Sequence, residues 1–193
     1  MGVIKTALEI AMERTESVKS DKSSIDQFDA KQRGKKLANA FLAGEADISN
    51  EIKKTDSSQR DSLKHGVFDV LISQITLPAD KDDEKRIENA GKGLSIIINN
   101  SRFNAIHKQL TQLFSQYLQE AAQYEQAIRQ QYGPKLRQKE EELSRRVGRE
   151  VHIDPFQDPE FVVFYNQHMN ALKGNYQSLI DKAKEEAQMM FTR

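Results

Sequence analysis

The sequence predicts an all-α protein in which a long antiparallel, coiled-coil-like helical hairpin follows a smaller N-terminal helical bundle. Apolar residues recur at intervals of three and four along most of the chain, and only 4 of the 193 residues are proline, as amphipathic helices require. The mean hydropathy is −0.72 and 30% of the residues are charged. We expect an N-terminal helical subdomain of residues 1–100 and a hairpin of residues 101–193 with its turn near 148–158.

Composition and charge exclude several classes of protein. The 29 basic and 29 acidic residues cancel, which argues against a protein that coats nucleic acid or an anionic membrane. The chain contains no cysteine, so disulfides, zinc–thiolate sites and thiol catalysis are excluded. No apolar run approaches the length of about 18 residues that spans a bilayer, and charges interrupt the apolar residues at 1–15. We therefore expect neither a membrane segment nor a signal peptide, and a cytoplasmic location.

Two helices are expected before Gly44, which is a typical helix stop. The second of them begins at Ser23 or Ser24, because either serine can cap a helix. Gly34 lies inside it, although glycine is a poor helix former. The first helix covers 3–20, with one face formed by Ile4, Leu8, Ala11, Thr15 and Val18.

The rest of the first hundred residues predicts two more helices. Residues 44–56 are polar and acidic, which suits one short helical turn. A third helix begins at Ser57 or Ser58 and ends before Pro78, and a charged turn leads into a fourth. The β-branched run SIII at 95–98 leaves a strand open as an alternative at the end of this fourth helix.

The second half has the clearer helical periodicity. One arm runs from Phe103 to Val147, and a second opens at Asp158 or Pro159 and continues to residue 191. Apolar residues of the first arm lie at 103, 106, 110, 113, 117 and 124, widened by Phe114, Ala121 and Ile128. Those of the second are Phe161, Tyr165, His168, Met169, Leu172, Tyr176, Leu179, Ala183 and Met190. Two long amphipathic helices with a short connection pack antiparallel.

Two places in the hairpin contain helix-breaking residues. The pair Gly133-Pro134 is expected to bend or interrupt the first arm. At the turn, Gly148 can adopt the left-handed conformation that ends a helix. Because side chains of an extended segment alternate, Val151 and Ile153 are expected to fold inward while His152 faces water. The apolar partners expected for this cap are Phe156 and Phe161.

No residue pattern indicates catalysis, so we expect neither catalytic residues nor a cofactor or metal. The four histidines form no metal-binding pair, and His152 with Asp154 gives two potential ligands where a site needs three or four. Residues 90–95, AGKGLS, lack the spacing of a phosphate-binding loop, and their small side chains favour close approach of another helix. The carboxylates at 140–142 point in different directions around a helix, which is typical of a solvated face.

Charge is unevenly distributed along the hairpin. Residues 129–150 contain seven basic and four acidic residues, whereas the second arm is acidic. The interpretation we favour is intramolecular: the basic end of the first arm lies beside Asp158 and Glu160 of the second. The alternative is contact with RNA phosphates. The residues that would make it are Lys135, Arg137, Lys139, Arg145, Arg146 and Arg149.

Glutamines form a second regular feature of the first arm. They recur at intervals of three and four beside the apolar stripe, at 109, 112, 116, 119, 123, 126 and 130. They are either an uncharged polar border or a surface that pairs with another helix, whether of a second copy or of a partner. For such a surface the expected contact residues are Gln112, Gln116, Gln119 and Gln123.

Two stretches of the chain resemble an uncharacterised helical family of bacteria. They are MGVIKTALEIAMERT at 1–15 and RRVGREVHIDPFQDPEF at 145–161. The resemblance implies a bacterial, cytoplasmic protein and carries no functional residue. A looser resemblance to the stalk subunits of rotary ATPases rests on the long Gln/Glu/Lys-rich helices.

Three functions remain open from sequence alone. The leading hypothesis is a non-enzymatic scaffold or interaction protein that acts through the hairpin, with a protein partner or a second copy. The second is an RNA- or ribosome-associated protein that uses the basic segment 135–149. The third is an enzyme with a pocket between the two halves.

Overall fold

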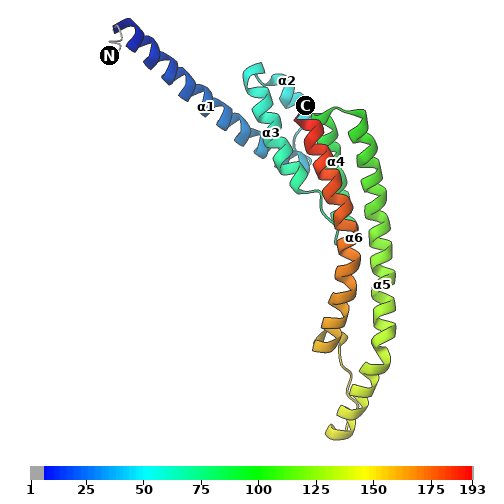
Figure 1. Ribbon diagram of the computed structural model, residues 1–193. Helices are drawn as coiled ribbons and strands as arrows, with labels where there is room; N and C mark the ends of the chain where they lie inside the picture. The colour runs from blue at the N-terminus through cyan, green and yellow to red at the C-terminus, as the bar shows by residue number, and fades with distance from the viewer. Residues whose placement is uncertain (1–6, 193) are drawn as a thin grey trace, which may run out of the picture. The chain divides into compact units, whose positions relative to one another are not determined.

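The chain is all-α, as the sequence predicts. The computed structural model describes the backbone of residues 7–192 and the side chains of residues 24–192, and no strand occurs in that part of the chain (Figure 1). Its helices are α1 (Ala7–Leu42), α2 (Ile48–Lys54), α3 (Ser57–Ser73), α4 (Lys81–Ile98), α5 (Ser101–Val147), the short 3-10 helix η1 (Pro155–Gln157) and α6 (Pro159–Phe191).

Residue contacts divide the chain into two compact units. The first contains the residues up to Gln74 together with Asn89–Asn100. The second contains Ile75–Glu88 and the residues from Ser101 onward. The first unit therefore holds the smaller helical bundle, and the second holds the hairpin.

The first element differs from its prediction because α1 is one helix rather than two. Ser23 and Ser24 lie within it and do not begin a new helix. The sequence from Ala7 to Arg33 contains neither glycine nor proline, and a serine inside a helix costs only a few tenths of a kcal/mol. Residues 3–6 of the predicted helix, and the side chains of its predicted face, lie outside the described residues.

Two glycines bring α1 and α3 into backbone contact in the first unit. A Cβ atom added at Gly34 would lie 2.1 Å from the carbonyl oxygen of Leu63. One added at Gly66 would lie 2.0 Å from the carbonyl oxygen of Lys31. Only glycine permits this approach, which explains why one interrupts the helix-forming sequence of α1.

The second half of α4 packs against the same unit. Gly93 is buried, and a Cβ there would lie 2.6 Å from Leu71 and 2.9 Å from Phe41. The expectation that these small residues admit another helix is confirmed. The run at 95–98 is helical, so the alternative of a strand is wrong.

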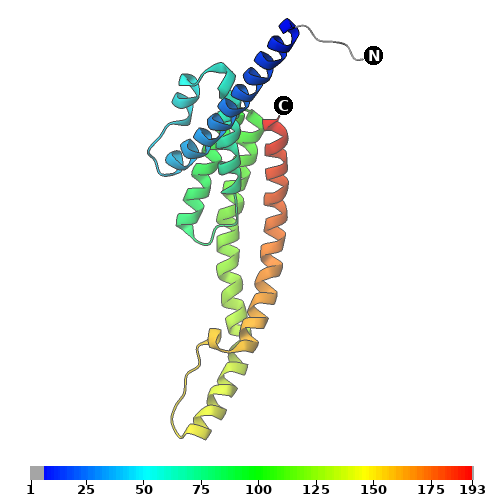
Figure 2. The same ribbon diagram turned by 90° about the vertical axis from the view of Figure 1, so that its left-hand side faces the viewer.

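The second unit is built on the antiparallel pair α5 and α6, which lie side by side in both views (Figures 1 and 2). Helix α5 is 47 residues long and continues through Pro134 without a break. Buried side chains of the two helices form a cluster of Ile128, Tyr132, Phe161 and Met169. Of the predicted α6 face, Leu179 is 47% exposed, and the buried residue is its neighbour Ile180.

The hairpin turn lies where the sequence predicts it. Gly148 has φ +71° and ends α5 in the left-handed conformation. The segment that follows is extended, with the His152 side chain exposed and those of Val151 and Ile153 only half-buried. The inward alternation is therefore correct in direction, although the cap is shallower than expected. Phe156 is itself 44% exposed.

Candidate protein-interaction surface

The glutamine row forms one side of α5. Exposed residues from Gln109 to Ala127 are uncharged except for the Glu125 side chain, which is 37% exposed and paired with Arg129, in a chain of which 30% is charged. The uncharged residues, called here the amide face, are Gln109, Gln112, Ser115, Gln116, Gln119, Ala122, Gln123, Tyr124, Gln126 and Ala127. Soluble protein surfaces usually contain about 25–35% charged residues, so the amide face is unusual for a solvated surface.

Two glutamates occur in this stretch, and both are partly buried and engaged by neighbouring side chains. Glu120 is half-buried and accepts a hydrogen bond from the Gln116 amide at 2.9 Å. Its pKa is lowered by a hydrogen bond from the Tyr176 hydroxyl of α6 and by the one from Gln116. Glu125, also half-buried, accepts from Nε and Nη2 of Arg129 at 3.0 and 2.8 Å.

Burial also shifts the pKa of Tyr176, the partner of Glu120. It raises the pKa of Tyr176 to about 12, together with the hydrogen bond to Glu120. Tyr176 therefore keeps its proton at neutral pH, and its hydroxyl donates a hydrogen bond to the Glu120 carboxylate. The ring packs edge-on against Tyr117 of α5 at 5.1 Å between centroids, so this contact also joins the two arms.

The amides of the row are largely available for a partner. Apart from the bond from Gln116 to Glu120, Gln112, Gln119 and Gln123 make no hydrogen bond within the described part of the chain. Each amide can donate and accept at once. A helix with complementary amides or hydroxyls could therefore bind along this face.

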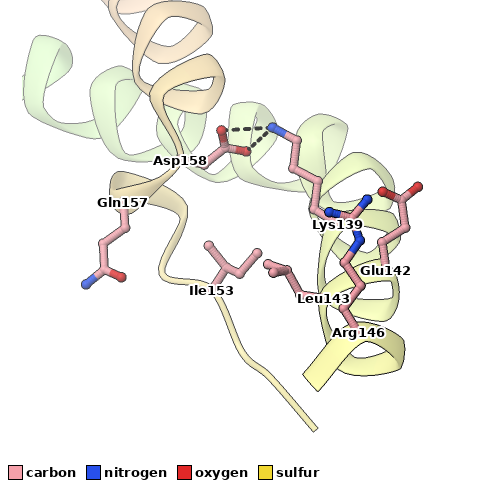
Figure 3. A pocket seen from close by; sticks show the side chains of 7 residues that line it. All are labelled: Lys139, Glu142, Leu143, Arg146, Ile153, Gln157 and Asp158. Atoms are coloured by element: carbon pink, nitrogen blue, oxygen red, sulfur yellow. Dashed lines mark hydrogen bonds and ion pairs between the residues drawn. The ribbon is translucent and has the colours of Figure 1, made fainter. Parts of the chain in front are cut away.

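The predicted charge pairing between the two arms is confirmed at the turn end of the hairpin. Lys139 of α5 contacts both carboxylate oxygens of Asp158 at 2.9 and 2.8 Å, as Figure 3 shows. It also contacts Glu160 at 2.8 Å, and Lys135 contacts the same glutamate at 2.8 Å. The buried Tyr132 hydroxyl donates to Asp158 at 2.9 Å.

The pKa values of this cluster favour its charged form. Burial alone would raise the pKa of Asp158, but hydrogen bonds from Lys139 and Tyr132 and the backbone N–H of Glu160 outweigh burial and lower it. The two lysines lower the pKa of Glu160 to about 2. Hydrogen bonds to these carboxylates raise the pKa of Lys139. The two lysines and the two carboxylates are thus charged at neutral pH, and Asp158 also caps the first turn of α6.

The extended segment 149–154 lies along the end of α5 and is held by side chains of that helix. The backbone N–H of Val151 donates to Ser144 Oγ at 2.9 Å, and that of Ile153 donates to Glu140 at 2.8 Å. Glu140 is therefore half-buried and engaged, in contrast to the solvated role that its sequence predicts.

A groove lies on each side of this segment. The first, of about 370 Å³, is lined by Lys139, Glu142, Leu143, Arg146, Ile153, Gln157 and Asp158. In Figure 3, Leu143 and Ile153 point toward each other across it. The second, of about 400 Å³, has a lining that includes Arg137, Arg145 and His152. Both grooves are open and mixed in charge, with no convergent catalytic set.

The six basic residues proposed for phosphate contact differ in their exposure and in their pairing with carboxylates. Lys135 and Lys139 are engaged by carboxylates of the second arm. Arg145 lies 3.8 Å from Glu141 in an exposed pair. The other three arginines, Arg137, Arg146 and Arg149, are exposed.

The histidines considered as candidate ligands lie in surroundings that suit a structural role. His168 is half-buried against the Phe164 ring at 4.4 Å between centroids, in agreement with an interface histidine. The side chain of His152 is 81% exposed beside Glu140 and Glu150. Within residues 24–192, no group of three or more histidine or acidic side chains is placed to hold a metal ion. None of the described helices is long and apolar enough to cross a membrane.

Sequence reasoning missed two kinds of residue. Tyr132 and Tyr176 look like ordinary core aromatics at helical spacing, yet their hydroxyls bind the acidic groups that connect the arms. Ser144 and Glu140 bind the extended segment at separations of seven and thirteen residues. For Ser144 and Glu140, the one available signal was a polar side chain near the end of a helix that an extended segment follows, and this signal is weak.

The fold and surfaces together define an all-α protein with a long helical hairpin closed by an ion-pair cluster. A family model matches residues 49–189, which is most of the chain, and its description is a family of unknown function, DUF6657. The chain belongs to this family. The match includes the second resembling stretch, 145–161, whereas residues 1–15 lie outside it. No curated protein and no solved structure matches the chain.

Proposed function

We propose that the protein is a non-enzymatic interaction protein whose hairpin binds another protein through the amide face. The contact residues would be Gln112, Gln116, Gln119 and Gln123. The observation that carries the proposal is the scarcity of exposed charge between Gln109 and Ala127, where the one partly exposed charge, Glu125, is paired with Arg129. Depletion of charge is the compositional signal of interface cores, whereas overall hydrophobicity is not.

The ion-pair cluster supports this role by holding α5 in place. A binding helix that kept its rotational freedom would lose entropy on association, and preorganisation removes that cost. Tyr132, Lys139 and Asp158 connect the arms at one end of the hairpin. The amide face is thereby presented on a supported helix rather than on a loop. The setting we propose is the bacterial cytoplasm, following the resemblance of residues 1–15 and 145–161.

Site-specific photo-crosslinking in the host tests the proposal. A benzophenone amino acid at Gln123 should crosslink to a second polypeptide, and the same group at Gln138 should not. Gln138 is an exposed glutamine of the same helix that lies outside the amide face. Adding Gln119→Lys should abolish the crosslink at position 123, because it introduces an unpaired charge into the contact. Equal crosslinking at 123 and 138, or no effect of the lysine, would contradict the proposal.

The second candidate is an RNA- or ribosome-associated protein that uses residues 135–149. It is favoured by the exposure of Arg137, Arg146 and Arg149 near the turn. It is weakened by the engagement of the two lysines of the set in ion pairs. RNA retention should fall steeply with salt, because phosphate contacts release counterions. Unchanged retention in a protein carrying Arg145→Glu and Arg146→Glu would exclude it.

A further inference from the structure

The spacing of the amide face has a symmetry of its own. Its glutamines follow one another at intervals of three, four, three, four, three and four from Gln109 to Gln130. Read in the opposite direction, the same alternation returns. An antiparallel copy of α5 centred at Gln119 would therefore present glutamines within one residue, or about 1.5 Å, of matching heights along the whole row.

The chemistry of the face is also self-complementary. A carboxylate can only accept hydrogen bonds and a guanidinium can only donate them, so such groups need a different partner, whereas an amide pairs with another amide. Because the charges that border the face are few and already engaged, Glu125 by Arg129 and Glu84 by Ser115, two identical faces repel each other only weakly. An acidic or basic partner would gain no ion pair there. The best-matched occupant is the same face of a second copy.

The residues between the glutamines permit close approach. Ala122 and Ala127 are exposed and small, and small side chains let helices pack closely. Ser115 is also small, but its hydroxyl donates a hydrogen bond to Glu84 of α4, so α4 borders the face at that point. Antiparallel α5 helices also align their dipoles favourably. With the axis at Gln119, Lys108 of one copy lies at the height of Gln130 of the other, next to Arg129, whose charge is paired with Glu125, and the two copies of Lys108 are far apart.

We propose that the protein forms a two-fold dimer in which the amide faces of two α5 helices pair antiparallel, with the axis near Gln119. The proposal rests on the proposed function and names the partner as a second copy of this chain. The face has ten exposed residues per copy, against about 20–30 a side in a standard interface. The dimer is therefore weak, reversible and dependent on protein concentration.

Sedimentation equilibrium of the purified full chain tests the dimer. The average mass should rise from 22.1 kDa toward twice that value as the concentration rises from roughly 5 to 500 µM. Gln119→Lys and Gln119→Glu proteins should each stay monomeric, because like charges meet at the axis. An equimolar mixture of the two should dimerise again.

The matched controls are Gln138→Lys and Gln138→Glu, which place the same charges on the same helix outside the amide face. Both should dimerise like the unmodified protein. A chain that stays monomeric at every concentration would overturn the proposal, and so would a Gln119→Lys protein that dimerises normally. A mixture of the two charged proteins that fails to associate would also overturn it.

The orientation can be measured because the chain has no cysteine. A spin label on Gln130→Cys should report about 33 Å between the two copies of that position, from 1.5 Å per residue over eleven residues on either side of the axis. A parallel pair would place the labels roughly 10 Å apart, near the interaxial distance of packed helices, and that result would overturn the antiparallel arrangement.

The photo-crosslinking experiment separates the dimer from the proposed function. A protein that is monomeric in solution but crosslinks through position 123 to a different polypeptide refutes the dimer and leaves the proposed function standing.

Discussion

Replacing Gly34 by alanine should destabilise the first unit, although alanine is the better helix former. The added Cβ would lie 2.1 Å from the carbonyl oxygen of Leu63, whereas ordinary van der Waals contacts are 3.4–4 Å. The two helices must therefore separate by more than about 1 Å. The obstacle is backbone inside a helix, which cannot rotate away as a side chain would.

The magnitude follows from two opposing terms. Overpacking of a well-packed site costs typically 1–3 kcal/mol, and a backbone obstacle places this site at the upper end. Alanine recovers about 1 kcal/mol of helix propensity. The net loss of unfolding free energy should be about 1–2 kcal/mol. Gly66→Ala should behave in the same way, because its Cβ would lie 2.0 Å from the carbonyl oxygen of Lys31.

Native-state hydrogen exchange is the appropriate assay because the chain has two units, and a single melting temperature would mix them. Amides of α1 and α3 should exchange faster in the Gly34→Ala protein, while those of α5 should be unchanged. Gly174→Ala in α6 is the matched control: nothing lies within 4 Å of its added Cβ, so it should stabilise the hairpin by roughly 0.5–1 kcal/mol. Unchanged or slower exchange of α1 in the Gly34→Ala protein would refute the close crossing.

Three further predictions concern the hairpin. Tyr132→Phe removes a buried hydrogen bond and keeps the ring, so unfolding in urea should show a loss of about 1 kcal/mol; no change would mean that Asp158 is satisfied without the hydroxyl. The pKa of Glu160 is about 2 in the folded chain against an ordinary 4.5, so its stabilisation is present above about pH 4.5 and is lost as the pH falls toward 2. Glu160→Gln should therefore flatten the fall in stability between about pH 5 and 2 in urea unfolding, and an unaltered profile would contradict the ion pairing. Ile153→Ala should cost roughly 1 kcal/mol because the side chain is half-buried, and His152→Ala should cost little; a thermal melt in which His152→Ala is the more damaging change would show that the turn depends on the histidine.

Helical periodicity was sufficient to predict most of the hairpin, including the pairing of its arms, because core positions there repeat along one helix. It failed by one residue in α6, where Leu179 was expected in the core and Ile180 is buried. The expected positions Tyr165, Leu172 and Leu179 are spaced by seven. A straight α-helix drifts by about 20° in each heptad, so its buried stripe shifts to the next residue after a few turns.

Long-range contacts could not be predicted in this way. Gly34 looked like a weak point of a helix because the helix that crosses it lies about thirty residues further along the chain. Its role depends on Leu63 and Val67 of α3 meeting it at a particular crossing, and no local pattern encodes that geometry. The same is true of the hydrogen bonds from segment 149–154 to the end of α5, because the backbone donors and their side-chain acceptors are not separated by any regular number of residues.

The amide face could be predicted only in part from the sequence. The glutamines are visible in the sequence, but Glu120 and Glu125 lie among them. The sequence alone therefore does not predict that this side of α5 carries little exposed charge. The fold engages both charges, because Tyr176 comes from the opposite arm to bind Glu120 and Arg129 lies one turn further along α5 to bind Glu125. Replacing Tyr176 by phenylalanine should therefore leave Glu120 with one hydrogen bond fewer, return its pKa toward the ordinary value, and weaken dimerisation without any change in the amide face itself. Sedimentation of Tyr176→Phe beside Tyr117→Phe, which keeps the bond to Glu120, decides whether neutrality of the face or the glutamines alone drives association: equal dimerisation of both proteins would show that the buried tyrosine has no part in it.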